Sequence, residues 1–174
     1  MNPYIYVRQA CEGGKSLLSL CCGIGAEFKR LTTTRVTAVD IVPEYLEKVN
    51  EIYPHVKTVL RDAVDYTAEQ PDKSVDVISI IDGIEHLTKQ EGLRLIKEMK
   101  RVAKQQIIIF TPDGYTKNEP HHAWDVPAGD EAQIHRSGWT RAELEGLGFK
   151  FLVSFKYTSA HGEKYRANVM RWKV

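Results

Sequence analysis

Short apolar runs that alternate with amphipathic segments constrain the fold more than any other feature of this sequence. Runs rich in β-branched residues predict five strands, at residues 16–22, 35–40, 56–60, 75–81 and 106–111. An amphipathic pattern predicts helices at 43–53, where Pro43 suits the first helical position, and at 93–102. Such alternation is typical of a parallel sheet with helices on both faces, whose ligands bind at the carboxyl ends of the strands.

The C-terminal part of the chain has a different pattern. Thr140 and Glu143 form a capping box for a short helix. Two further runs, 150–157 and 166–174, predict strands whose short connection makes them an antiparallel hairpin. We therefore expect an α/β fold, a doubly wound and mostly parallel seven-stranded sheet with a C-terminal antiparallel hairpin.

The length of the chain suits one α/β domain over residues 1–174. Within it, residues 1–15 are expected to form an N-terminal extension. Residues 112–139 show almost no periodicity, and a segment of this length inside a compact domain usually carries function. We expect this segment to be a loop that covers the substrate.

Charge and hydropathy limit the classes of partner. The 24 Lys and Arg residues nearly balance 23 Asp and Glu residues, so nucleic acid is not expected as a partner. No run of about 18 apolar residues occurs, which predicts neither a membrane span nor a signal peptide. The odd number of cysteines, two of them adjacent in a strand end, favours a reduced, cytoplasmic location. The oligomeric state stays open.

Candidate cofactor-binding residues follow three successive strands. Gly23 and Gly25 follow the first strand, where they let the backbone turn sharply and approach a ligand closely. Their spacing does not match the glycine pattern of dinucleotide-binding loops. Asp40 ends the second strand, where its carboxylate can accept hydrogen bonds from both ribose hydroxyls. Asp62 follows the third strand, either as a helix cap or as an acceptor for an adenine amino group.

These residues resemble motifs of the class I S-adenosylmethionine-dependent methyltransferase superfamily, specifically the small type 11 and type 12 domains. The resemblance extends over residues 16–149, and its most specific part is 75–87, which resembles the fourth strand of the family and the turn after it. It departs from the family at Ser19, where the first motif has an acidic residue, and at Cys21, where it has glycine. We interpret this site as altered and not abolished.

The resemblance implies a Rossmann-like fold, S-adenosyl-L-methionine as cofactor and S-adenosyl-L-homocysteine as product. It also implies a set of cofactor-binding residues at the strand ends. These are Cys21, Cys22, Gly23, Gly25, Asp40, Ile41, Asp62, Ala63 and Asp82.

Methyl transfer needs no dedicated catalytic residue, but a hydroxyl acceptor benefits from a general base. The catalytic candidates are therefore His86, His121 and His122, although His86 can also be a purely structural side chain. The candidates for substrate binding are Trp124, His135 and Arg136 in the long loop. A metal site built from loop histidines and Asp125 is an alternative, but we assign no metal ligands from the sequence.

The sequence leaves three functions open. The first is a methyltransferase that acts on a small molecule, with the oxygen of a sugar-like compound suggested by residues 135–140, which resemble segments of small methyltransferases associated with sugars and surface glycans. The second is a non-catalytic cofactor-binding or scaffold domain with a degenerate first motif. The third is a nicotinamide-dependent oxidoreductase, which the glycine spacing disfavours.

Overall fold

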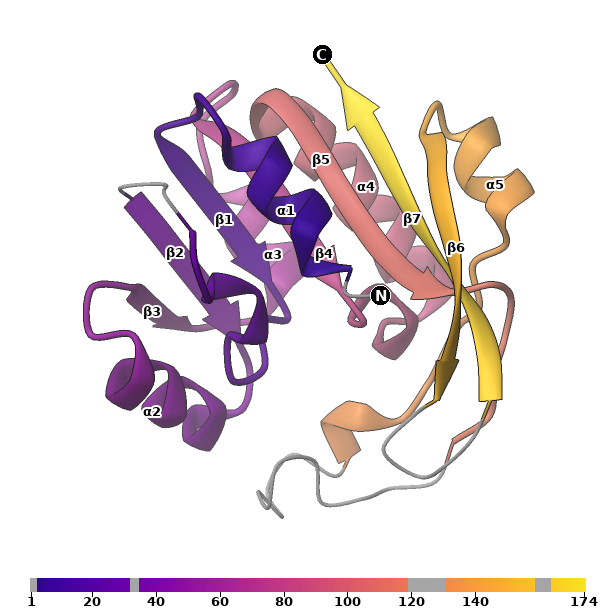
Figure 1. Cartoon of the computed structure of the whole chain (residues 1–174), viewed down its shortest axis with the longest axis horizontal. Coiled ribbons are helices and arrows are strands. Elements are labelled where there is room, and N and C mark those ends of the chain that lie inside the picture. Colours follow the sequence, from indigo (N-terminus) through magenta and orange to yellow (C-terminus); the bar gives the residue numbers. More distant parts are fainter. Residues whose placement is uncertain (1–2, 32–34, 119–130, 159–163) are drawn as a thin grey trace.

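The computed structural model describes residues 3–31, 35–118, 131–158 and 164–174, and its centre is one seven-stranded sheet (Figure 1). The strands are β1 (Ser16–Leu20), β2 (Arg35–Asp40), β3 (Lys57–Leu60), β4 (Val75–Ile81), β5 (Ala103–Pro112), β6 (Lys150–Thr158) and β7 (Lys164–Lys173). They lie in the order β3-β2-β1-β4-β5-β7-β6. Strands β1 to β5 pair in parallel, and β7 is antiparallel to both β5 and β6. The predicted Rossmann-like class with a C-terminal hairpin is confirmed.

The helices are α1 (Tyr4–Cys11), α2 (Pro43–Ile52), α3 (Ala63–Ala68), α4 (Lys89–Val102) and α5 (Arg141–Gly146), with single 3-10 turns η1 (Ala26–Phe28), η2 (Ile84–His86) and η5 (Glu131–Gln133). Helix α2 begins with Pro43, and the capping box of Thr140 and Glu143 precedes α5, both as predicted. Helix α1 lies inside the segment expected to be only an extension. No helix in the described ranges is both long and apolar enough to cross a membrane.

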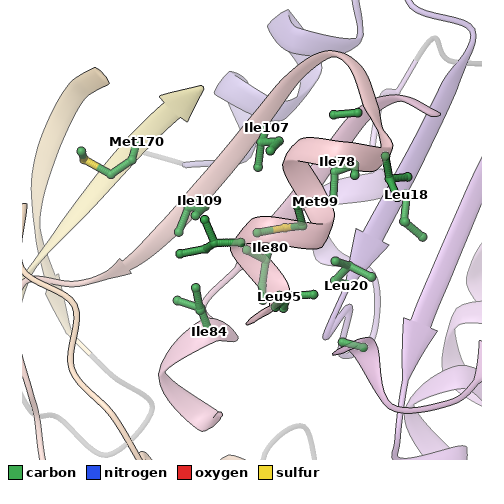
Figure 2. Packing of buried hydrophobic residues seen from close by; sticks show 14 of the residues in the cluster. Leu18, Leu20, Ile78, Ile80, Ile84, Leu95, Met99, Ile107, Ile109 and Met170 are labelled. Atoms are coloured by element: carbon green, nitrogen blue, oxygen red, sulfur yellow. The ribbon is translucent and has the colours of Figure 1, made fainter. Parts of the chain in front are cut away.

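Both faces of the sheet are buried, because alternate residues of each strand point to opposite sides. One cluster, drawn in Figure 2, contains Ile78, Ile80, Ile107 and Ile109 of the strands with Leu95 and Met99 of α4. A second cluster contains Val77, Ile108 and Phe110 of the same strands with Val7 of α1 and Val49 of α2. Burial on two sides explains why these strands appear in the sequence as continuous apolar runs.

The strand order reverses between β1 and β4. Strands β2 and β3 continue from β1 to one side, whereas β5 continues from β4 to the other side (Figure 1). Ligands of open α/β sheets bind outside the carboxyl ends of the strands at such a reversal. The segments that follow β1 and β4, at 21–25 and 82–88, therefore lie where a cofactor is expected.

Gly92 of α4 is packed directly against the indole of Trp139. A Cβ atom built at Gly92 would overlap this ring, and Trp139 is fully buried. Exchange of glycine for alanine in a helix normally stabilises it by about 0.5–1 kcal/mol. Here we expect Gly92→Ala to lower the free energy of unfolding by about 1–2 kcal/mol, because the indole cannot move without disturbing the core. Urea denaturation measures this change.

Gly146 of α5 provides the matched control. A Cβ atom at Gly146 meets no atom within 4 Å. Gly146→Ala should therefore leave the free energy of unfolding unchanged or raise it. Equal destabilisation by both substitutions would contradict the steric explanation at Gly92.

Candidate cofactor-binding and active site

The turn after β1 holds the first group of predicted cofactor-binding residues. Cys21, Gly23 and Gly25 all have positive φ angles, of 50°, 51° and 73°. A side chain at Gly25 would also overlap the ring of Phe28, so this glycine is required by space as well as by conformation. Cys21 adopts the left-handed conformation despite its side chain, at a cost of about 1–2 kcal/mol. This conformation ends β1 at Leu20, two residues before the end predicted from the apolar run.

Asp40, at the end of β2, is tied to this turn. Its carboxylate oxygens accept hydrogen bonds from the backbone N–H of Gly23, at 2.9 Å, and of Val42, at 3.1 Å. Burial raises the pKa of Asp40, and these hydrogen bonds oppose the increase. Because each carboxylate oxygen has two lone pairs, the backbone contacts fix the carboxylate and leave acceptor capacity toward a ligand.

Asp62 caps α3, which was one of the two roles expected for it. One of its oxygens, Oδ1, accepts hydrogen bonds from the N–H groups of Val64, at 2.8 Å, and Asp65, at 3.0 Å. The adjacent Ala63 is buried. The cap uses only one of the two carboxylate oxygens, so it is compatible with the second predicted role, contact with an adenine amino group.

The surroundings of Cys21 indicate that the carboxyl ends of several strands lie close together. Burial raises the pKa of its thiol, and the negative charges of Asp40, Asp62 and Glu85 raise this pKa further. Asp40 ends β2, whereas Asp62 and Glu85 follow β3 and β4, so acidic groups from three strand ends lie around one thiol after β1. A Cβ atom built at Gly83, in the loop after β4, would lie 2.8 Å from Cys21 Cβ. The loops after β1 and β4 are therefore in direct contact.

Glu27 is a buried acidic residue that the sequence did not bring to attention. Its Oε1 accepts hydrogen bonds from the hydroxyl groups of Ser19 and, at 3.1 Å, of Ser79. These two serines are register partners on β1 and β4. Burial raises the pKa of Glu27 to about 7, against the effect of both hydrogen bonds. Its other oxygen, Oε2, is buried and has no hydrogen-bond partner among the described residues.

Glu27 thus places a carboxylate beside Ser19, which stands where the resembled motif has an acidic residue. The resembled motif has its acidic side chain at Ser19, and the hydroxyl of Ser19 instead donates to Glu27. The usable signal in the sequence was an acidic residue eight positions after Ser19.

A second acidic pair, Asp82 and Glu85, follows β4. Burial raises the pKa of both carboxyl groups, and the charge of Asp82 raises the pKa of Glu85 further. The Oε2 atom of Glu85 accepts a hydrogen bond from the hydroxyl of Thr111 at 3.0 Å. Its Oε1 atom is buried, and a side-chain hydrogen bond that joins Glu85 to Asp82 also raises the pKa of Glu85.

The segment before α5 brings His135 to this pair. The backbone carbonyl of Glu85 accepts hydrogen bonds from the N–H groups of Arg136, at 2.8 Å, and Ser137, at 3.0 Å. The rings of His86 and His135 lie with their centroids 5.1 Å apart. The structure therefore brings two histidines predicted for different roles, one catalytic and one substrate-binding, next to a buried carboxylate.

The motif at 135–140 has a structural explanation beyond any contact with substrate. A Cβ atom at Gly138 would overlap the backbone of Tyr115. Trp139 donates a hydrogen bond from Nε1 to the Ser137 hydroxyl at 3.0 Å, and the amino group of Lys89 lies 3.7 Å from its ring centroid. These contacts attach the segment to α4.

Some of the remaining predicted residues can be placed in the structure, and others cannot. His121, His122 and Trp124 lie outside the described residues. Arg136 is exposed, and the thiol of Cys22 donates to the carbonyl of Gly23 at 3.4 Å. No disulfide involves any of the three cysteines.

Comparison of the chain with known proteins identifies the protein family that it matches. A family model described as a methyltransferase domain matches residues 17–106. No curated protein matches the chain. Among solved structures, the YcgJ protein from Bacillus subtilis is similar with a TM-score of 0.69 and 12% identity, covering 98% of this chain and 97% of its own.

Two further similar structures carry more descriptive names. The N-terminal domain of EvdMO1, in the presence of S-adenosylhomocysteine and D-fucose, has a TM-score of 0.70 and 17% identity, covering 100% of this chain and 83% of its own. The Burkholderia thailandensis 1,6-didemethyltoxoflavin-N1-methyltransferase, with 1,6-didemethyltoxoflavin and S-adenosylhomocysteine bound, has a TM-score of 0.63 and 17% identity, covering 98% and 76%. At these identities the structures show a shared fold. Because the family model covers more than half of the chain, the protein belongs to the methyltransferase-domain family and is a class I enzyme with S-adenosylmethionine as its cofactor.

Proposed function

We propose that this enzyme methylates a hydroxyl oxygen of a small, sugar-like acceptor. The observation that carries the proposal is the convergence of two groups of side chains at one end of the sheet. The first group, around the Gly23 turn and Asp40, suits an adenosine. The second group, Glu85 with His86 and His135, suits a hydroxyl that must lose a proton. D-fucose with the similar EvdMO1 domain supports a sugar-like acceptor.

In this proposal the strand ends bind the cofactor. The Asp40 carboxylate accepts hydrogen bonds from the ribose hydroxyls, and Asp62 accepts from the adenine amino group. Ile41 and Leu60, which are 56% and 54% exposed, offer apolar surface that the adenine ring covers. Four further residues line the site beside Gly23 and Gly25, and these are Cys21, Cys22, Ala63 and Asp82.

Glu27 binds the charged amino group of the cofactor in this proposal. A buried carboxylate with an unpartnered oxygen is costly unless it meets a cation or a donor. The amino group of S-adenosylmethionine carries a positive charge and three donors. The altered motif at Ser19 and Cys21, which favoured a non-catalytic domain, is thereby compensated at Ser19.

For methyl transfer, the main task of the protein is to position the two reactants. S-adenosylmethionine supplies an electrophilic methyl group. The residues of the chain hold the acceptor hydroxyl in line with it and exclude water. The segment 112–139 covers the acceptor, and its residues His121, His122, Trp124 and Arg136 stay predictions for contact with it. Because none of the cysteines forms a disulfide, we place the enzyme in a reduced, cytoplasmic environment.

The test is a survey of acceptors with the purified chain. Incubation with S-adenosylmethionine and a panel of sugars, sugar nucleotides, amines and phenols should yield S-adenosylhomocysteine with hydroxyl-rich acceptors. Mass spectrometry should find one added methyl group on oxygen in the product. Turnover restricted to amines or carbon acceptors would refute the proposal.

A further inference from the structure

Glu85, His86 and His135 form a compact cluster of metal-ligating side chains. The first two belong to η2, directly after β4, and His135 comes from the segment after η5. One ligand atom from each side chain can be chosen so that all three atoms lie within 4.8 Å of one another. Glu85 is fully buried, and its carboxyl group lies against that of Asp82, with which it shares a side-chain hydrogen bond.

In each side chain of the cluster, one polar atom is held by a contact with another residue. His135 has Nδ1 2.6 Å from the backbone carbonyl of Thr116, which fixes the proton on Nδ1 and the lone pair on Nε2. His86 has Nδ1 3.4 Å from the carbonyl of Ile134. The Oε2 atom of Glu85 is held by Thr111. Metal-ligating histidines commonly have their second nitrogen bound to a backbone carbonyl in this way, which orients the first nitrogen toward the metal.

The backbone also fixes the distance between the two halves of the cluster. The Glu85 carbonyl accepts the N–H groups of Arg136 and Ser137, the two residues after His135. Asn118 accepts a hydrogen bond from the His135 N–H at 2.7 Å and donates to the carbonyl of Gln133 at 2.6 Å. Side chains held this firmly lose little conformational entropy when they bind a ligand.

The charge of the site favours a cation. Asp82 and Glu85 are two neighbouring buried carboxyl groups. In the part of the chain that the structure describes, no lysine or arginine forms an ion pair with either of them. Two imidazoles with one carboxylate select first-row transition metals over Mg²⁺ and Ca²⁺, which prefer oxygen ligands.

We propose that Glu85, His86 and His135 bind one divalent transition-metal ion, of the class of Mn²⁺, Co²⁺ or Zn²⁺, beside the cofactor turn. This assignment makes His86 a ligand in place of the general base predicted from the sequence. The site adjoins the cofactor turn, because Gly83 contacts Cys21 and the charge of Glu85 acts on the Cys21 thiol. Three protein ligands leave coordination positions open for an acceptor.

The role of the ion rests on the proposed function, whereas the site itself does not. An ion with an acceptor hydroxyl in an open position lowers the pKa of that hydroxyl. The O–H bond then breaks and its proton passes to water, and the oxygen forms a bond to the methyl carbon. The carbon–sulfur bond of the sulfonium breaks, and its electron pair stays on sulfur as the neutral thioether. Charge and atoms balance without a further reactant.

The experiment is a titration of the full chain, untagged and treated with a chelator, with Co²⁺ followed by visible absorption. Wild type should bind one Co²⁺ ion, and His135→Ala, His86→Ala and Glu85→Gln should each weaken binding at least tenfold. His55→Ala, at an exposed histidine of the described chain, is the matched control and should bind as wild type does. Titration of each variant with S-adenosylhomocysteine identifies any that has lost its fold.

The outcomes separate the metal site from the proposed function. A lack of saturable Co²⁺ binding in wild type, or binding that survives all three substitutions, overturns the site. Loss of Co²⁺ binding with S-adenosylhomocysteine affinity retained supports it. If Co²⁺ binds as expected but no hydroxyl acceptor is methylated, the site stands and the proposed function fails.

Discussion

Replacement of Asp40 by alanine is expected to weaken the binding of S-adenosylhomocysteine by about 1–3 kcal/mol, or about 5- to 150-fold in the dissociation constant. In the proposed site the ribose hydroxyls lose their acceptor, and in the structure the N–H groups of Gly23 and Val42 lose theirs as well. The position of the turn then depends on weaker contacts. Isothermal titration calorimetry of wild type and variant measures the difference directly.

A cofactor analogue separates contact with the ribose from disturbance of the turn. If Asp40 contacts the ribose, wild type should bind a 2′-deoxy analogue of S-adenosylhomocysteine more weakly than the parent compound. Asp40→Ala should then bind the two compounds alike, because the interaction has already been removed. Asp65→Ala, at an exposed aspartate, is the control. The same preference for the parent compound in wild type and in Asp40→Ala would count against this placement of the ribose.

The sheet could be predicted because most of its strands are buried on two sides. The apolar runs 35–40 and 75–81 coincide with β2 and β4, since every residue of such a strand is under pressure to be apolar. Helix α1 could not be predicted in the same way. Tyr4, Ile5 and Val7 are poor helix formers, and α1 is stabilised by packing on β4 and β5, to which the local sequence gives no clue.

In the candidate site, too, some residues could be predicted from the local sequence and others could not. The sequence could place Gly23, Asp40 and Asp62 at or just after strand ends, because the motif that contains each of them is local in sequence. Glu27 and Glu85 could not be, because each acquires its environment from side chains on other elements. Ser79 lies 52 residues from Glu27, and Thr111 lies 26 residues from Glu85. Contacts between residues so far apart in the sequence depend on the register of the strands. That register cannot be inferred from any one position of the sequence.

The departure at Ser19 illustrates the same limit. Considered alone, the loss of an acidic side chain from the first motif indicates weakened cofactor binding. In the structure the hydroxyl of Ser19 donates to Glu27, so the carboxylate has moved from the strand to the following 3-10 turn η1. The Glu27 carboxylate therefore lies beside Ser19, although Glu27 stands eight positions later in the sequence. This relocation makes Glu27 the residue whose substitution separates stability from function.

Glu27→Gln is expected to stabilise the protein by about 3 kcal/mol near pH 8 and to change its stability little near pH 4. Burial raises the pKa of Glu27 from 4.5 to about 7. Between these values the folded protein keeps a proton that the unfolded chain has released, so stability falls as the pH rises. Glutamine is neutral at every pH and avoids this loss, while its carbonyl still accepts from Ser19 and Ser79.

Urea denaturation at several pH values checks the stability effect. Asp40, Asp82 and Glu85 also have raised pKa values, so only the difference between variant and wild type isolates Glu27. Glu47→Gln, at an exposed position of α2, is the control and should show no such pH dependence. A difference between Glu27→Gln and wild type that stays constant with pH would show that Glu27 is not the group that titrates.

The same substitution should weaken the binding of S-adenosylhomocysteine near pH 8, because the cationic amino group of the ligand loses its carboxylate partner. Adenosine, which lacks that amino group, should bind wild type and Glu27→Gln equally. Opposite signs for stability and affinity would therefore assign the buried charge to the ligand, since a residue kept only for folding would have no reason to carry a charge that destabilises the fold. Increased stability with unchanged affinity for both ligands would remove Glu27 from the binding site.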